Sequence, residues 1–259
     1  MKLNGQVAIV TGGGTGVGQA TSLKLAAEGC TVIVNYSRSQ KEAAQTVNTI
    51  VEAGGRALSH QADVGDDQQV KAMVEQATSQ FGQLDILVNN AGTTEFISFK
   101  NLEAADLEAW ERIFRVNVIG AFQMARASAR AMELTSGKGH IVNVSSIAGI
   151  NATGSSIPYA ASKAALNNIT ISLARTLAPA IRVNAVAPGF ITGRWLEDGL
   201  GENYEKFRDA FNEQLPLGRV CEPEDVADAI LSLVLGSELI TGQILPCDSG
   251  MSVMAPLKI

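Results

Sequence analysis

Short apolar runs alternate along the chain with stretches whose apolar residues recur at helical spacing. The apolar runs cover residues 7–10, 31–35, 57–61, 84–88, 140–144, 182–187 and 243–245. The helical stretches cover residues 19–28, 40–53, 66–81, 104–132, 157–178 and 223–235. Because continuous apolar runs are typical of parallel strands buried on both faces, the pattern predicts an α/β fold with a doubly wound parallel sheet of about seven strands. Helices should flank both faces of this sheet and give three layers.

No linker or low-complexity tract interrupts this alternation, so residues 1–259 are predicted to form a single domain. Residues 193–216 stand apart because they are charged and aromatic and lie between a predicted strand and a predicted helix. Insertions of this length are more often functional than idle. We therefore expect this segment to serve the protein's activity.

Composition and charge exclude several classes of function. The net charge of −6 and the sequence pI near 5.0 argue against a nucleic-acid or anionic-membrane partner. Neither a signal-peptide pattern nor a run of 18 apolar residues occurs, so we expect a cytoplasmic protein. The cysteines Cys30, Cys221 and Cys247 are scattered and fit reduced thiols. His60 and His140 have no further ligands at metal-binding spacing, so no metal site is expected.

A glycine-rich segment, Gly-Gly-Gly-Thr-Gly-Val-Gly at residues 12–18, separates the first predicted strand from the first predicted helix. Glycines at such a turn let the backbone turn tightly and approach a pyrophosphate, which binds at the N-terminus of the helix. A plain strand-to-helix turn is the alternative. Strand, glycine turn and helix together favour a Rossmann-type dinucleotide-binding unit.

Tyr159 and Lys163 stand four residues apart in a predicted helix, so their side chains share one face. A free tyrosine keeps its proton up to a pKa of about 10, and a nearby ammonium lowers that pKa. Such a tyrosine could exchange a proton with an alkoxide near neutral pH, and Ser146 could hydrogen-bond the same oxygen. The same spacing occurs in ordinary exposed helix pairs, so the interpretation depends on the other motifs.

Seven ordered motifs resemble those of the short-chain dehydrogenase/reductase family, and the resemblance covers about residues 3–253. Thr11 to Gly18 matches the family's Thr-Gly-x-x-x-Gly-x-Gly. Ser146 lies thirteen residues before Tyr159, which is the spacing common in the family, and is therefore preferred over Ser145. The other motifs are Asp63-Val64, Asn89-Asn90-Ala91-Gly92, Asn117, Tyr159-x-x-x-Lys163 and Pro188-Gly189-Phe190-Ile191-Thr192.

The resemblance implies hydride transfer between a nicotinamide and a substrate carbon, with a role for each of four side chains. Tyr159 would be the general acid/base, and Lys163 would lower the pKa of Tyr159 and hold the nicotinamide ribose. Ser146 would polarise the carbonyl, and Asn117 would anchor a water that connects Lys163 to solvent. The implied cofactor-binding residues are Gly12, Thr15, Gly16, Val17, Gly18, Asp63, Val64, Asn90, Ala91, Gly92, Tyr159, Lys163, Pro188, Gly189, Ile191 and Thr192.

Residues 193–216 resemble the family's substrate lid. Its candidate substrate contacts are Trp195, Phe207 and Phe211, although a lid also needs an apolar core of its own. Relatives pair through helices that correspond to residues 104–132 and 157–178, which implies a homo-oligomer, either a tetramer or a dimer. The turns before the fifth and sixth strands offer few basic residues, which argues modestly against a carrier-protein partner.

The end of the second predicted strand distinguishes the two nicotinamide cofactors. An acidic side chain there bonds the ribose 2′-OH of NAD, whereas a basic one accommodates a 2′-phosphate. The chain has no carboxylate there but has Asn35, Ser37 and Arg38, which predicts NADP(H) in preference to NAD(H). The alternative is that Arg38 is only a solvated residue. Thr15 also stands where many NADP-preferring relatives carry a second basic residue.

We therefore expect an NADP(H)-dependent oxidoreductase that interconverts a secondary alcohol and a ketone, as a 3-oxoacyl reductase or another carbonyl reductase does. An NAD-dependent alcohol dehydrogenase and a catalytically silent nucleotide-binding regulator are the alternatives. Intact Ser146, Tyr159 and Lys163 argue against the silent regulator. A sugar-nucleotide epimerase or dehydratase would carry another glycine spacing and a longer C-terminal domain. The small-molecule substrate stays open between a steroid, a sugar, an acyl thioester, a quinone and a small ketone.

Overall fold

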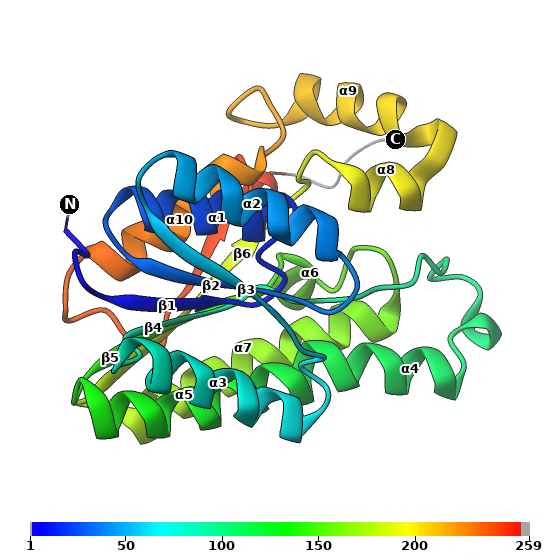
Figure 1. The fold of residues 1–259 in the computed structure, drawn as a ribbon. Coiled ribbons are helices and arrows are strands. Elements are labelled where there is room, and N and C mark those ends of the chain that lie inside the picture. Colours follow the sequence, from blue (N-terminus) through cyan, green and yellow to red (C-terminus); the bar gives the residue numbers. More distant parts are fainter. Residues whose placement is uncertain (1, 255–259) are drawn as a thin grey trace.

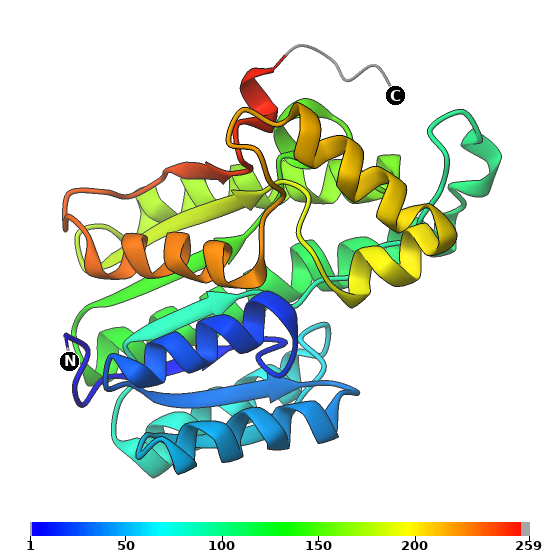
Figure 2. The same ribbon diagram turned by 90° about the horizontal axis from the view of Figure 1, so that it is seen from above.

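The apolar runs of the sequence form one parallel sheet in the computed structural model, which describes residues 2–254 (Figures 1 and 2). The strand order is β3-β2-β1-β4-β5-β6-β7. This confirms the predicted doubly wound α/β fold; residues 1 and 255–259 of the predicted domain lie outside the described residues. The strands are β1 Val7–Val10, β2 Thr31–Tyr36, β3 Arg56–Gln61, β4 Ile86–Asn89, β5 Gly139–Val144, β6 Ile181–Pro188 and β7 Ile244–Cys247.

Strands inside the sheet are apolar because helices cover both of its faces. Every residue of β1, β2, β4 and β6 is buried. The edge strand β3 instead carries only exposed and half-buried residues, and its Ser, His and Gln reflect that position. The contrast explains why continuous apolar runs, rather than alternating ones, mark the inner strands.

Helices cover the sheet in two groups (Figure 1). On one face α1 Gly16–Ala27 packs against both α2 Gln40–Glu52 and α10 Pro223–Leu235. On the other face α5 Ala121–Thr135 packs against α3 Asp67–Phe81 and α7 Ile157–Leu177. Each group encloses its own apolar core, which includes Leu25, Ile50 and Ile230 on the first face and Met73, Met124 and Ile141 on the second.

The long helix predicted over residues 104–132 is interrupted and begins later than expected. A short 3-10 turn, Leu102–Ala104, precedes α4 Leu107–Phe114, whose N-cap Asp106 accepts a hydrogen bond from the Ala109 N–H at 2.9 Å. A π-helical segment, Arg115–Gly120, then joins α4 to α5, which ends at Thr135. Single π-helical turns inside α-helices often mark functional sites, and this one contains Asn117.

The insertion at residues 193–216 folds into two helices, α8 Arg194–Leu200 and α9 Tyr204–Gln214, joined by the 3-10 turn Gly201–Asn203. Two further short helices were not predicted: α6 Ala148–Asn151, and the 3-10 turn Met251–Val253 after β7. The other predicted boundaries shift by at most three residues, and the largest shift is that α1 begins at Gly16.

The strand order reverses direction at β1, which pairs with β2 on one side and with β4 on the other. In open α/β sheets, ligands bind beyond the carboxyl ends of the strands at such a switch point. The glycine segment follows β1, and Asn90 to Gly92 follow β4. The fold therefore brings these two motifs to one crevice.

Candidate active site

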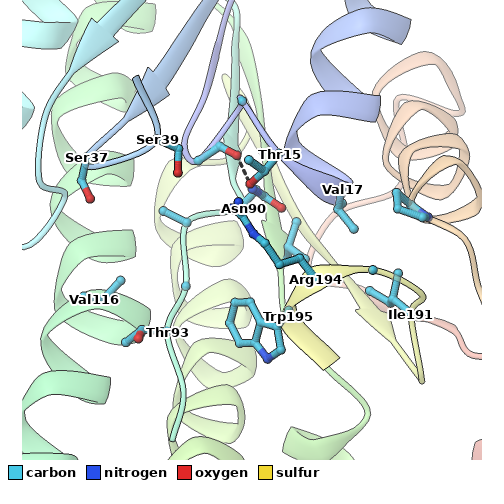
Figure 3. Close-up of a pocket in the computed structure, with 18 of the residues that line it drawn as sticks. Thr15, Val17, Ser37, Ser39, Asn90, Thr93, Val116, Ile191, Arg194 and Trp195 are labelled. Atoms are coloured by element: carbon cyan, nitrogen blue, oxygen red, sulfur yellow. Dashed lines mark hydrogen bonds between the residues drawn. The ribbon is translucent and has the colours of Figure 1, made fainter. Parts of the chain in front are cut away.

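A cavity of about 620 Å³ lies beyond the carboxyl ends of the strands and next to the start of residues 193–216, the predicted lid. Its lining residues come from the segments after the strands β1 to β6, from the π-helical segment, and from α7, α8 and the start of α10. Figure 3 shows that Thr15, Ser37 and Ser39 lie at one side and Trp195 nearer the opposite end. One cavity therefore joins the glycine segment to the tyrosine and lysine of α7.

Three positions of the loop require glycine, two because of close packing and one because of its backbone conformation. A Cβ on Gly18 would stand 2.1 Å from the Gly12 carbonyl oxygen, and one on Gly14 would stand 2.7 Å from the Ala43 N. Gly12 itself has a φ of +61°, a conformation that favours glycine. Gly12, Thr15, Gly16 and Val17 line the cavity as predicted for cofactor binding, whereas Gly18 packs beneath the loop. The residues present thus fit a dinucleotide whose pyrophosphate approaches the backbone.

Asn35, which is predicted to contact a 2′-phosphate, lines the cavity but has its amide engaged by the backbone. It is 1% exposed, and its Oδ1 accepts a hydrogen bond from the Gly12 N–H at 3.2 Å. Its Nδ2 donates to the Ala62 carbonyl oxygen at 3.0 Å. Because both ends of the amide are engaged, Asn35 shapes the glycine loop rather than offering a free side chain to a ligand. Ser37 and Arg38 line the cavity at the end of β2, as does Ser39.

The loop after β4 is tied to the segment that follows β1. The Thr11 Oγ1 accepts hydrogen bonds from the N–H groups of Asn90 and Ala91, each at 2.9 Å. The Asn90 Nδ2 donates to the carbonyl oxygens of Thr11 and Gly12. Asn90, Ala91 and Gly92 all line the cavity. The motif therefore holds the segment after β1 in position and also forms part of the cavity wall.

Ser146, Tyr159 and Lys163 all line the cavity. Tyr159 and Lys163 lie one turn apart on α7, and the Lys163 Nζ is 5.6 Å from the centre of the Tyr159 ring. Lys163 is 4% exposed, and its ammonium donates a hydrogen bond to the Val144 carbonyl oxygen at 2.8 Å. The Ser146 Oγ accepts from the Ala148 N–H at 3.1 Å. The hydroxyl groups of Ser146 and Tyr159 can therefore contact a substrate oxygen in the cavity, with the Lys163 ammonium next to the tyrosine ring.

Burial, rather than mutual charge, dominates the acidities of Tyr159 and Lys163. Burial raises the pKa of Tyr159 to about 12, against a smaller lowering by a hydrogen bond with Ser146. Burial also lowers the pKa of Lys163 to about 8. The direction at Tyr159 is opposite to the predicted lowering by Lys163. A tyrosine in this state holds its proton at neutral pH, which is the form needed to donate it.

Asn117 is buried in the π-helical segment and connects three parts of the site. Its Oδ1 accepts from the Thr93 N–H at 2.8 Å, and its Nδ2 donates to the Thr93 carbonyl oxygen at 2.9 Å. Nδ2 also lies 3.0 Å from the Ser162 Oγ on α7. These contacts position the loop after Gly92 against the helix of Tyr159. The predicted water relay through Asn117 stays a prediction.

Asp63 and Val64 line the cavity. Arg115 and Val116 also line it, although neither belongs to the predicted site residues. The Asp63 Oδ2 pairs with the Arg115 Nη2 at 2.9 Å, and Val116 lies next to it in the same wall. Both new residues belong to the π-helical segment. This π-helical segment could not be predicted from the sequence, because helical periodicity alone does not reveal an inserted turn.

The segment after β6 is held on one side by the residues that precede α10. The Thr192 N–H donates to the Cys221 carbonyl oxygen at 2.9 Å, and the Thr192 Oγ1 donates to Glu222 Oε2 at 2.5 Å. The four residues of this segment that are predicted to bind the cofactor all line the cavity, namely Pro188, Gly189, Ile191 and Thr192. These hydrogen bonds hold Thr192 in place directly before residues 193–216, the predicted lid.

The lid places one of its three predicted aromatic residues in the cavity. Trp195 lines it, with its ring centroid 6.3 Å from that of Tyr159 in an edge-on arrangement. Phe211 instead packs against Phe190 at 5.2 Å, and Phe190 also stacks on Tyr204 at 6.0 Å. Phe211 therefore supplies the lid's own core, and Phe207 is not among the lining residues. Arg194, Leu196 and Asp198 of α8 line the cavity without having been predicted.

Within residues 2–254 no group of three or more His, Cys, Asp or Glu side chains is arranged to hold a metal ion. No helix of that part of the chain is both long and apolar enough to span a membrane.

Comparisons with known proteins show which proteins this chain is similar to. Residues 12–252 match a family model described as enoyl-(acyl carrier protein) reductase. The chain is 41% identical over 248 residues to a Streptomyces violaceoruber protein assigned as ketoacyl reductase 2 of the granaticin polyketide synthase, with 96% of each chain covered. It is 37% identical over 256 residues to the 3-oxoacyl-[acyl-carrier-protein] reductase of Thermotoga maritima, covering 98% of this chain and 100% of the relative. A crystal structure assigned to a short-chain dehydrogenase/reductase from Burkholderia xenovorans gives a TM-score of 0.88 at 36% identity, covering 96% of this chain and 98% of the other.

Proposed function

Because the chain belongs to the short-chain dehydrogenase/reductase family and is an oxidoreductase of that family, we propose that it uses NADP(H) to interconvert a ketone and a secondary alcohol. One observation carries the proposal. Ser146, Tyr159 and Lys163 open into the same cavity as the glycine loop. A cofactor held along that cavity would bring its nicotinamide to the tyrosine and leave its adenine end near β2.

The bound nicotinamide would supply the hydride, and the side chains of this chain would manage the proton. Tyr159, protonated at neutral pH, donates its proton to the carbonyl oxygen as that oxygen gains negative charge. Ser146 donates a hydrogen bond to the same oxygen and polarises the carbonyl. Lys163 lies beneath the tyrosine ring and offers its ammonium to the ribose hydroxyls and to the developing phenolate.

The preference for NADP(H) is supported by the side chains at the end of β2. Ser37, Arg38 and Ser39 line the cavity there, and the stretch from Val34 to Ser39 contains no carboxylate. Arg38 brings positive charge to the place where a 2′-phosphate would lie. Asn35 no longer contributes to this preference, because its amide is used by the backbone.

An acyl compound with a 3-oxo group is the substrate class that the relatives favour. Relatives from Streptomyces violaceoruber and Thermotoga maritima are named as reductases of ketoacyl and 3-oxoacyl groups. Trp195 gives the entrance beside Tyr159 an apolar surface that suits the carbon chain of such a compound. Few basic residues lie in the turns before β5 and β6, so we propose a thioester substrate that does not depend on a carrier protein.

A homo-oligomer in the cytoplasm is the expected state of the protein. An apolar groove between α5 and α7 includes Phe122, Ala129, Ile169 and Leu173, and the Phe122 side chain is 41% exposed. These helices correspond to the pair through which relatives associate. Light scattering coupled to size-exclusion chromatography would check this, with a dimer or tetramer expected.

The proposed activity is tested by following NADPH oxidation at 340 nm with a 3-oxoacyl thioester that carries no protein, for example an acetoacetyl thioester of a short thiol. Turnover with NADPH but little with NADH is expected. Nucleotide binding without turnover of any ketone would contradict the enzymatic role and support a regulatory one. Turnover with NADH alone would contradict the cofactor assignment while leaving the reaction class in place.

A further inference from the structure

Arg194, a lid residue outside the sequence motifs, reaches into the cofactor end of the cavity. It is the first residue of α8 and follows directly after Thr192 and Gly193. It lines the same cavity as the glycine loop, and in Figure 3 its side chain extends toward the side where Asn90 and Thr15 lie. Its guanidinium therefore lies between the lid and the glycine loop.

An ion pair joins this arginine to helix α2. The Arg194 Nη1 lies 3.3 Å from the Oε1 of Glu42, in the first turn of α2. The relative exposures of the two side chains are 60% and 39%. An exposed pair of this kind contributes little to stability, so a stronger anion can replace the carboxylate. Phosphate is such an anion, because a guanidinium binds two of its oxygens at once.

The glycine loop beside this pair is suited to hold a diphosphate. Thr15, the N-cap of α1, makes no side-chain capping bond, and the first turn of α1 contains no acidic residue. The exposed N–H groups of this helix end therefore favour an anion. Gly14 packs against the backbone of Ala43, the neighbour of Glu42. A diphosphate at the loop would therefore bind near both partners of the ion pair. Arg194 would attract it and Glu42 would repel it.

We propose that Arg194 binds the diphosphate of the nicotinamide cofactor and that Glu42 holds the same guanidinium when no cofactor is bound. The inference rests on the proposed cofactor site. It adds to that site the residue Arg194 and a competition between Glu42 and the diphosphate for its guanidinium. Trp195 follows Arg194 in α8 and lies beside Tyr159. Binding of the diphosphate by Arg194 therefore also fixes the start of the lid above the catalytic tyrosine.

The test measures dissociation constants by isothermal titration calorimetry at one fixed ionic strength. The ligands are NADPH, NADH and 2′-AMP, which carries the adenine and the 2′-phosphate but no diphosphate. The variants are Arg194→Gln, Glu42→Gln, the double variant, and Arg208→Gln as the control. Arg208 lies in the lid helix α9, pairs with Glu205 and Asp209, and is not among the lining residues. Arg208→Gln therefore removes the same positive charge as Arg194→Gln, but at a position that does not line the cavity.

Arg194→Gln is expected to weaken NADPH and NADH alike by about tenfold and to leave 2′-AMP unchanged. Glu42→Gln is expected to tighten NADPH severalfold, and this gain should vanish in the double variant because the competition needs Arg194. If wild type and Arg194→Gln bind NADPH and NADH with equal affinities, the inference about Arg194 is overturned. Binding by the wild type would still support the proposed cofactor site. If Glu42→Gln also tightens NADPH binding in the double variant, Glu42 only repels the diphosphate. That result would overturn the proposed competition between Glu42 and the diphosphate for Arg194. Binding of neither dinucleotide to wild type would overturn the cofactor site and the inference together.

Discussion

The Nζ of Lys163 lies 5.6 Å from the ring centre of Tyr159, one helical turn away on α7. Lys163 is buried and Tyr159 is half-buried. Loss of water around the two groups moves their pKa values in opposite directions, to about 12 for the phenol and about 8 for the ammonium. The two pKa values therefore lie further apart than the ordinary values of 10.0 and 10.5. Both groups keep their protons at neutral pH, so the phenol is able to donate one to a substrate oxygen.

Replacing Tyr159 by Phe should remove the proton donor and leave the cofactor site intact. Ketone reduction is expected to fall by about 10²–10⁴-fold, the range for loss of a general acid. The NADPH dissociation constant should stay within about twofold of wild type, because the glycine loop and Arg38 are unchanged. Single-turnover kinetics and calorimetry would measure the two quantities. A Phe variant that keeps near-normal turnover would show that another group donates the proton.

Replacing Arg38 by Ala should change cofactor choice rather than general affinity. A charge-assisted contact with a 2′-phosphate is worth about 1.5–3 kcal/mol, so NADPH binding is expected to weaken by about tenfold or more. NADH has no 2′-phosphate and should bind almost unchanged. Parallel titrations followed by nicotinamide fluorescence would measure both constants. Similar losses for NADPH and NADH would rule out the assigned role of Arg38.

The sheet and most of the cavity wall could be predicted from the sequence because both depend on local features. Buried parallel strands need continuous apolar runs, and a pyrophosphate needs glycines at the first turn. Gly12, Asn90 and Ile191 consequently line the cavity where the motifs placed them. These residues act largely through their backbone or through short contacts that the fold itself fixes.

What could not be predicted depends on contacts between distant segments. Asn35 faces the backbone of Gly12 and Ala62, and neither contact can be inferred from the residues around it. The pairing of Arg194 with Glu42 spans 152 positions. The acidity of Tyr159 was predicted in the wrong direction because spacing shows which charge is near but not how much water burial removes. Side-chain burial and long-range pairing therefore mark the limit of inference from sequence.

His140 should make the protein less stable as the pH falls. Burial, with the positive charges of Arg182 and Lys138, lowers the pKa of His140 to about 4 from an ordinary value of 6.5. Between these two values the unfolded chain takes up a proton that the folded chain refuses, so the free energy of unfolding decreases as the pH falls from about 6.5 to 4. Above pH 6.5 the effect is absent.

Denaturant unfolding of wild type and His140→Gln at pH 7.5 and pH 4.5 would measure this contribution. The decrease in unfolding free energy between the two pH values should be smaller in the variant, since glutamine does not titrate. His60→Gln, on the edge strand β3, serves as the control and should keep the wild-type decrease. Equal decreases in all three proteins would mean that His140 is protonated equally well in both states.

Replacing Gly18 by Ala should damage the glycine loop by steric collision. The added Cβ would stand 2.1 Å from the Gly12 carbonyl oxygen and 2.5 Å from the Asn90 Nδ2, so the loop must move away from both. Such overpacking costs about 1–3 kcal/mol of stability, and the displaced loop should also bind NADPH at least tenfold more weakly. Gly54→Ala is the matched control, because Gly54 has a φ of +82° and nothing within 4 Å of an added Cβ. It should lose about 1–2 kcal/mol through backbone strain alone and keep its affinity for NADPH, whereas a Gly18→Ala protein with wild-type affinity would show that the loop need not pack this closely.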